Sequence, residues 1–221
     1  MKRVLFVFIL LLPALISAQP ADTSQLRQIA FEQLKNYKPF QGQDFFENKV
    51  VNFYYSQSGN VFLLTSTNIW GHCHGCSVHL SLFIFDKKAN LLKSYVDFTE
   101  AGSWGAAPDT SMITFYSDIN RFLFIIESGF TSGGYTESYT SVYAPIQDSL
   151  KEAATFQSYF GNQGAIWDDK DLVEWEVKYA LIPLKDNYPD IICHKTGTDK
   201  GKKIEEQWRY HYYKGKGYVK E

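Results

Sequence analysis

From Lys49 to the C-terminus, short runs rich in Val, Ile, Phe, Tyr and Thr alternate with Gly, Asn, Asp and Ser about every 8 to 12 residues. Runs so short and so closely spaced predict antiparallel strands, because parallel strands need long crossover connections. Turn-forming residues predict hairpin turns at 58–60, 88–90, 118–120 and 147–149. Further strands are predicted within 174–184, 190–196 and 203–214.

The number of such runs limits the possible architectures. About ten to twelve strands are too many for one flat sheet with both faces buried. We therefore expect an all-β, mainly antiparallel fold, either a β-sandwich or a barrel-like structure. A partial propeller is the alternative.

One segment near the N-terminus has a different periodicity. Apolar residues recur at helical spacing in the segment 23–37: Leu26, Ile29, Ala30, Leu34 and Tyr37. Asp22 or Thr23 can cap its start, and Pro39 ends it. We expect one amphipathic helix that lies on a sheet.

The first 18 residues have the pattern of a secretory signal peptide. Lys2 and Arg3 precede an apolar run that Pro13 interrupts, and Ser17 and Ala18 supply a small-residue cleavage site. The run is too short for a transmembrane helix. We expect a secreted or periplasmic protein that begins at Gln19 and has no transmembrane segment after cleavage.

The remaining residues, 19–221, are predicted to form a single β-rich domain, because about 200 residues suffice for one core. Two of the 22 basic residues lie in the signal, so the mature chain carries 20 against 24 acidic residues, a net charge of −4. This charge does not favour nucleic acid as a partner.

The motif GHCHGC at 71–76 places two cysteines and two histidines within six residues. Covalent haem attachment needs His directly after the second cysteine, where this chain has Ser77. A thioredoxin-type redox centre needs the first cysteine at a helix N-terminus, but Ser77–Phe85 alternates like a strand. In an exported protein, the motif instead predicts a disulfide between Cys73 and Cys76 that closes a turn.

Two alternatives remain open for these cysteines. Cys73 or Cys76 could bond to Cys193, the third cysteine of the chain. Alternatively, zinc or copper could be bound by the three thiols together with His72 or His74. With the disulfide as the leading hypothesis, we expect no cofactor.

Two glycine-rich segments, 100–109 and 127–139, are predicted loops that carry aromatic side chains. Their rings, Trp104, Phe130, Tyr135 and Tyr139, are candidate contacts for a saccharide or a peptide. The competing interpretation, which composition favours, is that these rings cover the ends of a sheet, since aromatic residues make up 17% of the chain.

No nucleophile elbow, zinc-protease motif, phosphate loop or dinucleotide fingerprint is present in the sequence. The leading hypothesis is therefore a non-enzymatic binding or structural module of unknown ligand. A metal-binding protein is the second hypothesis, and a secreted hydrolase is the third.

Overall fold

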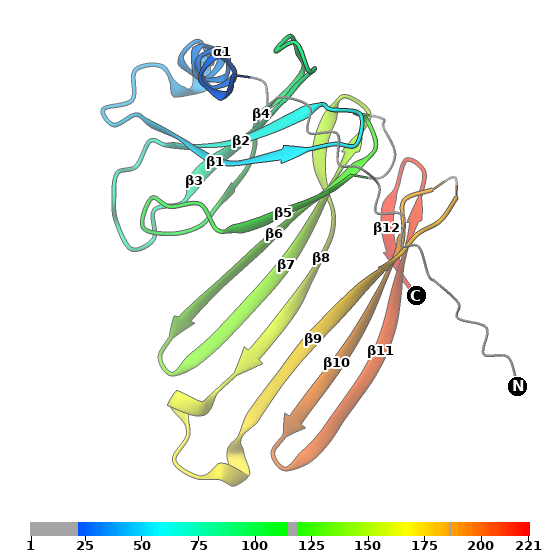
Figure 1. Ribbon diagram of the computed structural model, residues 1–221. Coiled ribbons are helices and arrows are strands. Elements are labelled where there is room, and N and C mark those ends of the chain that lie inside the picture. The colour runs from blue at the N-terminus through cyan, green and yellow to red at the C-terminus, as the bar shows by residue number, and fades with distance from the viewer. Residues whose placement is uncertain (1–21, 115–118, 186) are drawn as a thin grey trace, which may run out of the picture.

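The computed structural model describes residues 22–114, 119–185 and 187–221, in which twelve strands form two antiparallel sheets (Figure 1). The small sheet has the order β1 (Glu47–Tyr55), β2 (Val61–Asn68), β3 (Val78–Phe85) and β4 (Leu91–Ala101). The large sheet contains, in spatial order, β5 (Asp109–Thr114), β6 (Phe122–Ser132), β7 (Tyr135–Ile146), β8 (Ser149–Gly161), β9 (Val173–Ile182), β10 (Asp190–Asp199), β11 (Lys202–Tyr213) and β12 (Gly217–Lys220). The predicted all-β class is confirmed.

The helical elements are few and short. The amphipathic helix is α1 (Thr23–Lys35), which Asp22 caps by accepting a hydrogen bond from the Ser24 amide. It ends two residues earlier than the sequence predicts. Three 3-10 helices complete the described elements: η1 (Lys38–Phe40), η2 (Gln163–Ala165) and η3 (Asp169–Asp171). Within the described residues, no helix has the length and apolarity that a membrane span requires.

The two central strands of the small sheet, β2 and β3, are buried on both faces. On one face, α1 and η1 pack through Leu26, Leu34 and Phe40 onto β2 and β3 (Figure 1). On the other face, the side chains of β2 and β3 meet Phe122 and Phe124 of β6. Every described residue of β2 and β3 is buried, which explains why the first half of β2 and most of β3 are apolar.

The large sheet folds over on itself. The faces of β6, β7 and β8 that point away from the small sheet pack against β9 to β12 in a second core, which includes Ile125, Val142, Phe156 and Ile191. Only three residue pairs join β8 to β9, from Tyr159↔Glu176 to Gly161↔Glu174, so the two halves diverge beyond them. The result is a layered, sandwich-like arrangement. The described strands form neither the barrel-like structure nor the partial propeller that the sequence also allowed.

Three of the four predicted turns connect strands as expected, at 58–60, 88–90 and 147–149. The turn at 118–120 and the signal peptide 1–18 lie partly or wholly outside the described residues. The prediction of a loop over 127–139 is wrong: β6 and β7 continue through it and meet at the two-residue turn Gly133–Gly134. Both glycines have positive φ, as tight hairpin turns require.

Candidate functional site

Two loops at one end of the small sheet form part of the roof of the candidate site. The first, residues 69–77, connects β2 to β3 and contains the GHCHGC motif. Cys73 and Cys76 are joined by a disulfide, with their Cα atoms 5.0 Å apart. The predicted local disulfide is confirmed, and it closes a turn in which the Cys76 amide donates to the Cys73 carbonyl at 3.0 Å.

The second loop, residues 102–108, connects β4 to β5 and carries Trp104. The disulfide loop holds it by two hydrogen bonds: the Gly105 amide donates to the Cys76 carbonyl at 2.8 Å, and His72 Nδ1–H donates to the Trp104 carbonyl at 3.3 Å. The ring of His74 meets the ring of Trp104 edge to face at 4.9 Å. The disulfide loop therefore positions the indole.

Local backbone geometry fixes this contact between the loops. A Cβ atom at Gly105 would lie 2.3 Å from Asn68 Nδ2, and the φ of Gly105 is +70°. Asn68 in turn orders the disulfide loop, because its side chain accepts from the Trp70 and Gly71 amides and donates to the Gly71 carbonyl. Only glycine fits at position 105 while both hydrogen-bonded loops remain in place.

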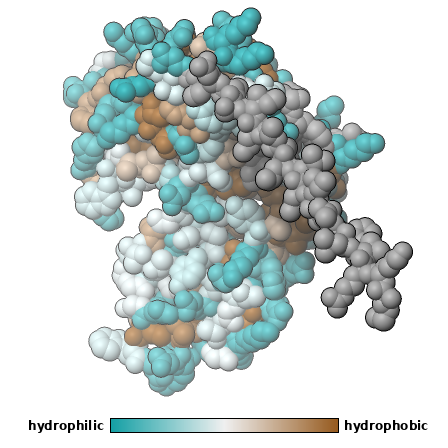
Figure 2. Space-filling model, in the orientation of Figure 1, coloured by the Kyte–Doolittle hydropathy of each residue, from teal (hydrophilic) through white to brown (hydrophobic). Residues whose placement is uncertain are grey.

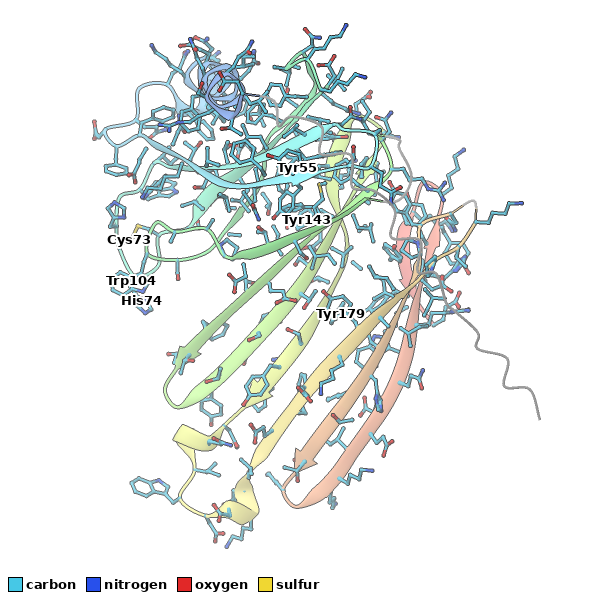
Figure 3. The ribbon with its side chains drawn as sticks, viewed as in Figure 1. Tyr55, Cys73, His74, Trp104, Tyr143 and Tyr179 are labelled. Atoms are coloured by element: carbon cyan, nitrogen blue, oxygen red, sulfur yellow. A yellow bond between two sulfur atoms is a disulfide. The ribbon has the colours of Figure 1, made fainter. Side chains whose placement is uncertain are left out.

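Below these loops lies a cleft of about 760 Å³ between the two sheets. Its floor is the face of β6 to β8 that continues outward from the buried core, and its roof is the end of β4 with the two loops. Figure 3 shows Cys73, His74 and Trp104 together on the overhanging loops, with Tyr143 deeper between the sheets. In the space-filling view, the surface is hollowed at the left between the upper and lower parts of the molecule (Figure 2).

The cleft brings together three of the four predicted aromatic residues. Trp104 projects from the roof, and Phe130 of β6 and Tyr139 of β7 lie on the floor. Trp104 and Phe130 are 58% and 55% exposed, so their rings are open to a ligand. Tyr135 does not line the cleft and instead contacts the Phe160 ring.

The polar lining of the cleft consists of hydroxyl and carboxylate groups. Tyr139 donates to Glu137 at 2.6 Å, and this hydrogen bond raises the pKa of Tyr139. Burial raises the pKa of Tyr143, whose hydroxyl lies 2.9 Å from that of Thr99. Glu100 and Glu152 add carboxylates, and no lysine or arginine is among the described residues that line the cleft.

The structure does not bring the predicted metal ligands together. Cys73 and Cys76 are oxidised to each other, and Cys193 is fully buried in the core formed by β6 to β12. Burial raises the pKa of the Cys193 thiol to about 11. His72 and His74 lie in the disulfide loop, and the described residues contain no cluster of three potential metal ligands. The alternative bridge from Cys73 or Cys76 to Cys193 is likewise not formed.

A buried histidine, paired with a half-buried aspartate, lies behind the roof of the cleft. His79 Nδ1–H donates to Asp97 at 2.7 Å, and Nε2 of His79 is buried without a partner in the described structure. The nearby Ser77 hydroxyl donates to Glu100 at 3.0 Å rather than to His79. This arrangement does not activate the serine as a nucleophile, because its hydroxyl is not hydrogen-bonded to the imidazole base.

Several lining residues were missed by reasoning from the sequence. Thr99, Glu100, Ser141, Tyr143 and Glu152 lie in ordinary alternating strand segments, with no local pattern that marks them. Register places Glu152 directly opposite Tyr143 on the floor. Only the pairing of distant strands reveals that these side chains share one surface.

Comparison of the chain with protein-family models, with curated proteins and with solved structures finds no match.

Proposed function

We propose that the protein is a secreted or periplasmic binding protein whose cleft takes a polar ligand that is uncharged or cationic. The observation that supports this most is the gathering of Trp104, Phe130 and Tyr139 around hydroxyl and carboxylate groups. Exposed rings that converge in a concave, partly polar site are typical of ligand-binding surfaces. Ring faces contact the apolar parts of a ligand, and the polar groups orient it.

The charge of the lining narrows the class of ligand. Glu100 and Glu152 lie in the cleft, and Glu137 is hydrogen-bonded to the lining residue Tyr139. An anionic ligand would meet these carboxylates with no lysine or arginine among the described lining residues to balance them. Like charges in close contact oppose binding, so a neutral saccharide or a cationic peptide suits the site better than an acidic polymer.

The test is a calorimetric titration of the purified protein with neutral oligosaccharides and with basic and acidic peptides. Binding of a neutral or basic ligand is expected, and Trp104→Ala or Phe130→Ala should weaken it at least tenfold. Trp167→Ala is the matched control, because Trp167 is fully exposed on a different loop. Equal affinity in Trp104→Ala, Phe130→Ala and the wild type, or binding of acidic peptides alone, would contradict the proposal.

A further inference from the structure

The outer half of β6, residues 128–132, forms an edge that no other described strand occupies. β5 pairs with β6 only as far as Asp109↔Glu127, and the chain before Asp109 leaves the sheet. On the opposite side, β7 pairs with β6 over this whole half. A groove of about 230 Å³ separates the 102–108 loop from residues 127–129, and it shares lining residues with the cleft.

The hairpin turn determines which backbone groups point to this free edge. In a two-residue hairpin, the residues that flank the turn, here Ser132 and Tyr135, form a hydrogen-bonded pair. Hydrogen-bonded and non-hydrogen-bonded pairs then alternate, so Gly129 and Thr131 do not exchange backbone hydrogen bonds with β7. The close contact of the Thr131 and Thr136 hydroxyls, 3.0 Å, agrees with a non-hydrogen-bonded pair. The N–H and C=O groups of Gly129 and Thr131 therefore face the free edge.

This edge lacks the features with which proteins usually prevent strands from pairing with other chains. Its sequence, SGFTS, contains no charged residue and no proline. Two of the outermost strands show such features: β1 begins with Glu47 and Lys49 around a salt bridge and contains a bulge, and β12 has only four residues, one of them Lys220. An unprotected edge beside a cleft is suited to accept an added strand.

We propose that residues 128–132 of β6 bind an extended cationic peptide of another protein as an additional antiparallel or parallel strand. This inference rests on the proposed binding function of the cleft and specifies its ligand. The free segment matches about five residues of extended peptide, or about 17 Å. Side chains of an added strand alternate between faces, so every second one points into the cleft, toward Trp104 and Glu100.

Charge complementarity supports a basic peptide over a second copy of this chain. Glu137 of β7 lies opposite Phe130 of β6, and Glu152 of β8 lies further along the floor. Glu100 lies on the roof, so both sides of the cleft carry negative charge. A second copy would bring its own uncharged segment to this edge and would add the same carboxylates rather than opposite charge. Lysine or arginine at alternate positions of a peptide would instead meet opposite charge.

The test uses an array of seven-residue peptides with Lys or Arg at every second position, together with acidic counterparts that carry Glu. The tightest binder is then measured against Thr131→Pro, which removes an edge N–H, and against the matched control Thr131→Val, which keeps it. Two further versions of the same peptide are N-methylated, one at the odd-numbered residues and one at the even-numbered residues; these are the two methylation phases. Only one phase blocks the hydrogen bonds to β6, so this comparison remains decisive if Thr131→Pro fails to fold.

Support for the proposal requires a basic peptide whose affinity falls at least tenfold in one methylated phase and is unchanged in the other phase and in Thr131→Val. Where Thr131→Pro folds, the affinity must fall at least tenfold in that variant too. If peptides bind with Trp104 dependence but without sensitivity to either backbone change, strand addition is wrong and the cleft function stands. The same conclusion follows if only oligosaccharides bind. A dimer in sedimentation that Thr131→Pro dissociates would make a second copy the occupant and overturn the peptide proposal. If neither class of ligand binds, both proposals fail.

Discussion

Removal of the Cys73–Cys76 disulfide should lower the free energy of unfolding by about 2 kcal/mol. The bond joins residues only three apart in sequence, so it closes a very small ring. In the chain-entropy description, a ring of this size restricts the unfolded chain by about 2 kcal/mol, whereas a bridge from Cys73 to Cys193 would contribute about 5 kcal/mol. The size of the loss therefore distinguishes a local disulfide from a long-range one.

The experiment compares Cys73→Ser/Cys76→Ser with its parent in urea denaturation, with Cys193→Ala in both proteins. That third substitution prevents alternative pairing, and its own cost is the same on both sides of the comparison. Similar m-values are required, because a change in m would indicate an altered denatured state. A loss below about 0.5 kcal/mol or above about 4 kcal/mol would refute the chain-entropy reasoning.

A local measurement tests the second role of the disulfide, which is to hold the loop that carries Trp104. The Gly105 amide donates to the Cys76 carbonyl at 2.8 Å, so its hydrogen exchange should accelerate when the disulfide is removed. The amide of Leu82, in the fully buried strand β3, serves as the control and should change only with global stability. Unchanged protection at Gly105 would show that the loop contact does not depend on the disulfide.

The remaining predictions concern stability and reactivity elsewhere in the fold. Cys193, with its pKa raised to about 11, should resist alkylation in the native protein at pH 8 and react on unfolding. Because the unfolded thiol ionises at lower pH than the native thiol, the free energy of unfolding should fall as pH rises from about 9 to 11. Urea denaturation at several pH values would show this fall. Gly134→Ala should destabilise more than Gly133→Ala in thermal melts, since both have positive φ but only the Cβ at 134 would lie 2.2 Å from a backbone carbon. Leu82→Ala should cost about 2 to 5 kcal/mol in urea denaturation, and the exposed Leu92→Ala less than about 0.5 kcal/mol.

The sequence predicted the elements whose formation is decided locally. Turn residues around Gly59 and Asn90 mark hairpins whose strands are neighbours in the chain, and the apolar face of α1 follows from helical spacing alone. The disulfide between Cys73 and Cys76 is also local, since both cysteines lie in one turn. Each of these features depends on interactions between residues close in sequence.

The arrangement of the cleft could not be predicted in this way, because it depends on contacts between distant strands. Glu100 and Glu152 approach the same space only because the small sheet packs on β6 to β8. The loop prediction for 127–139 is wrong for a different reason: the glycines and serines of this segment resemble a loop, and only the pairing of β6 with β7 shows a hairpin. The Gly133–Gly134 pair is a typical two-residue hairpin turn, but the small and polar residues before it give a weak strand signal.

Burial along β6 changes abruptly at the point where the proposed peptide edge begins. Phe122–Ile126 are buried, whereas Glu127 and most residues after it are exposed, so the outer half of the strand adds little to either core. Ordering the outer half of β6 costs conformational entropy, and this half buries little apolar surface to offset that cost. If the assigned register is right, the Gly129 and Thr131 amides should exchange rapidly in the free protein while those of Ser128 and Phe130, bonded to β7, exchange more slowly. Addition of a bound peptide should then protect Gly129 and Thr131 selectively, and the reverse alternation would show that the edge groups were wrongly assigned.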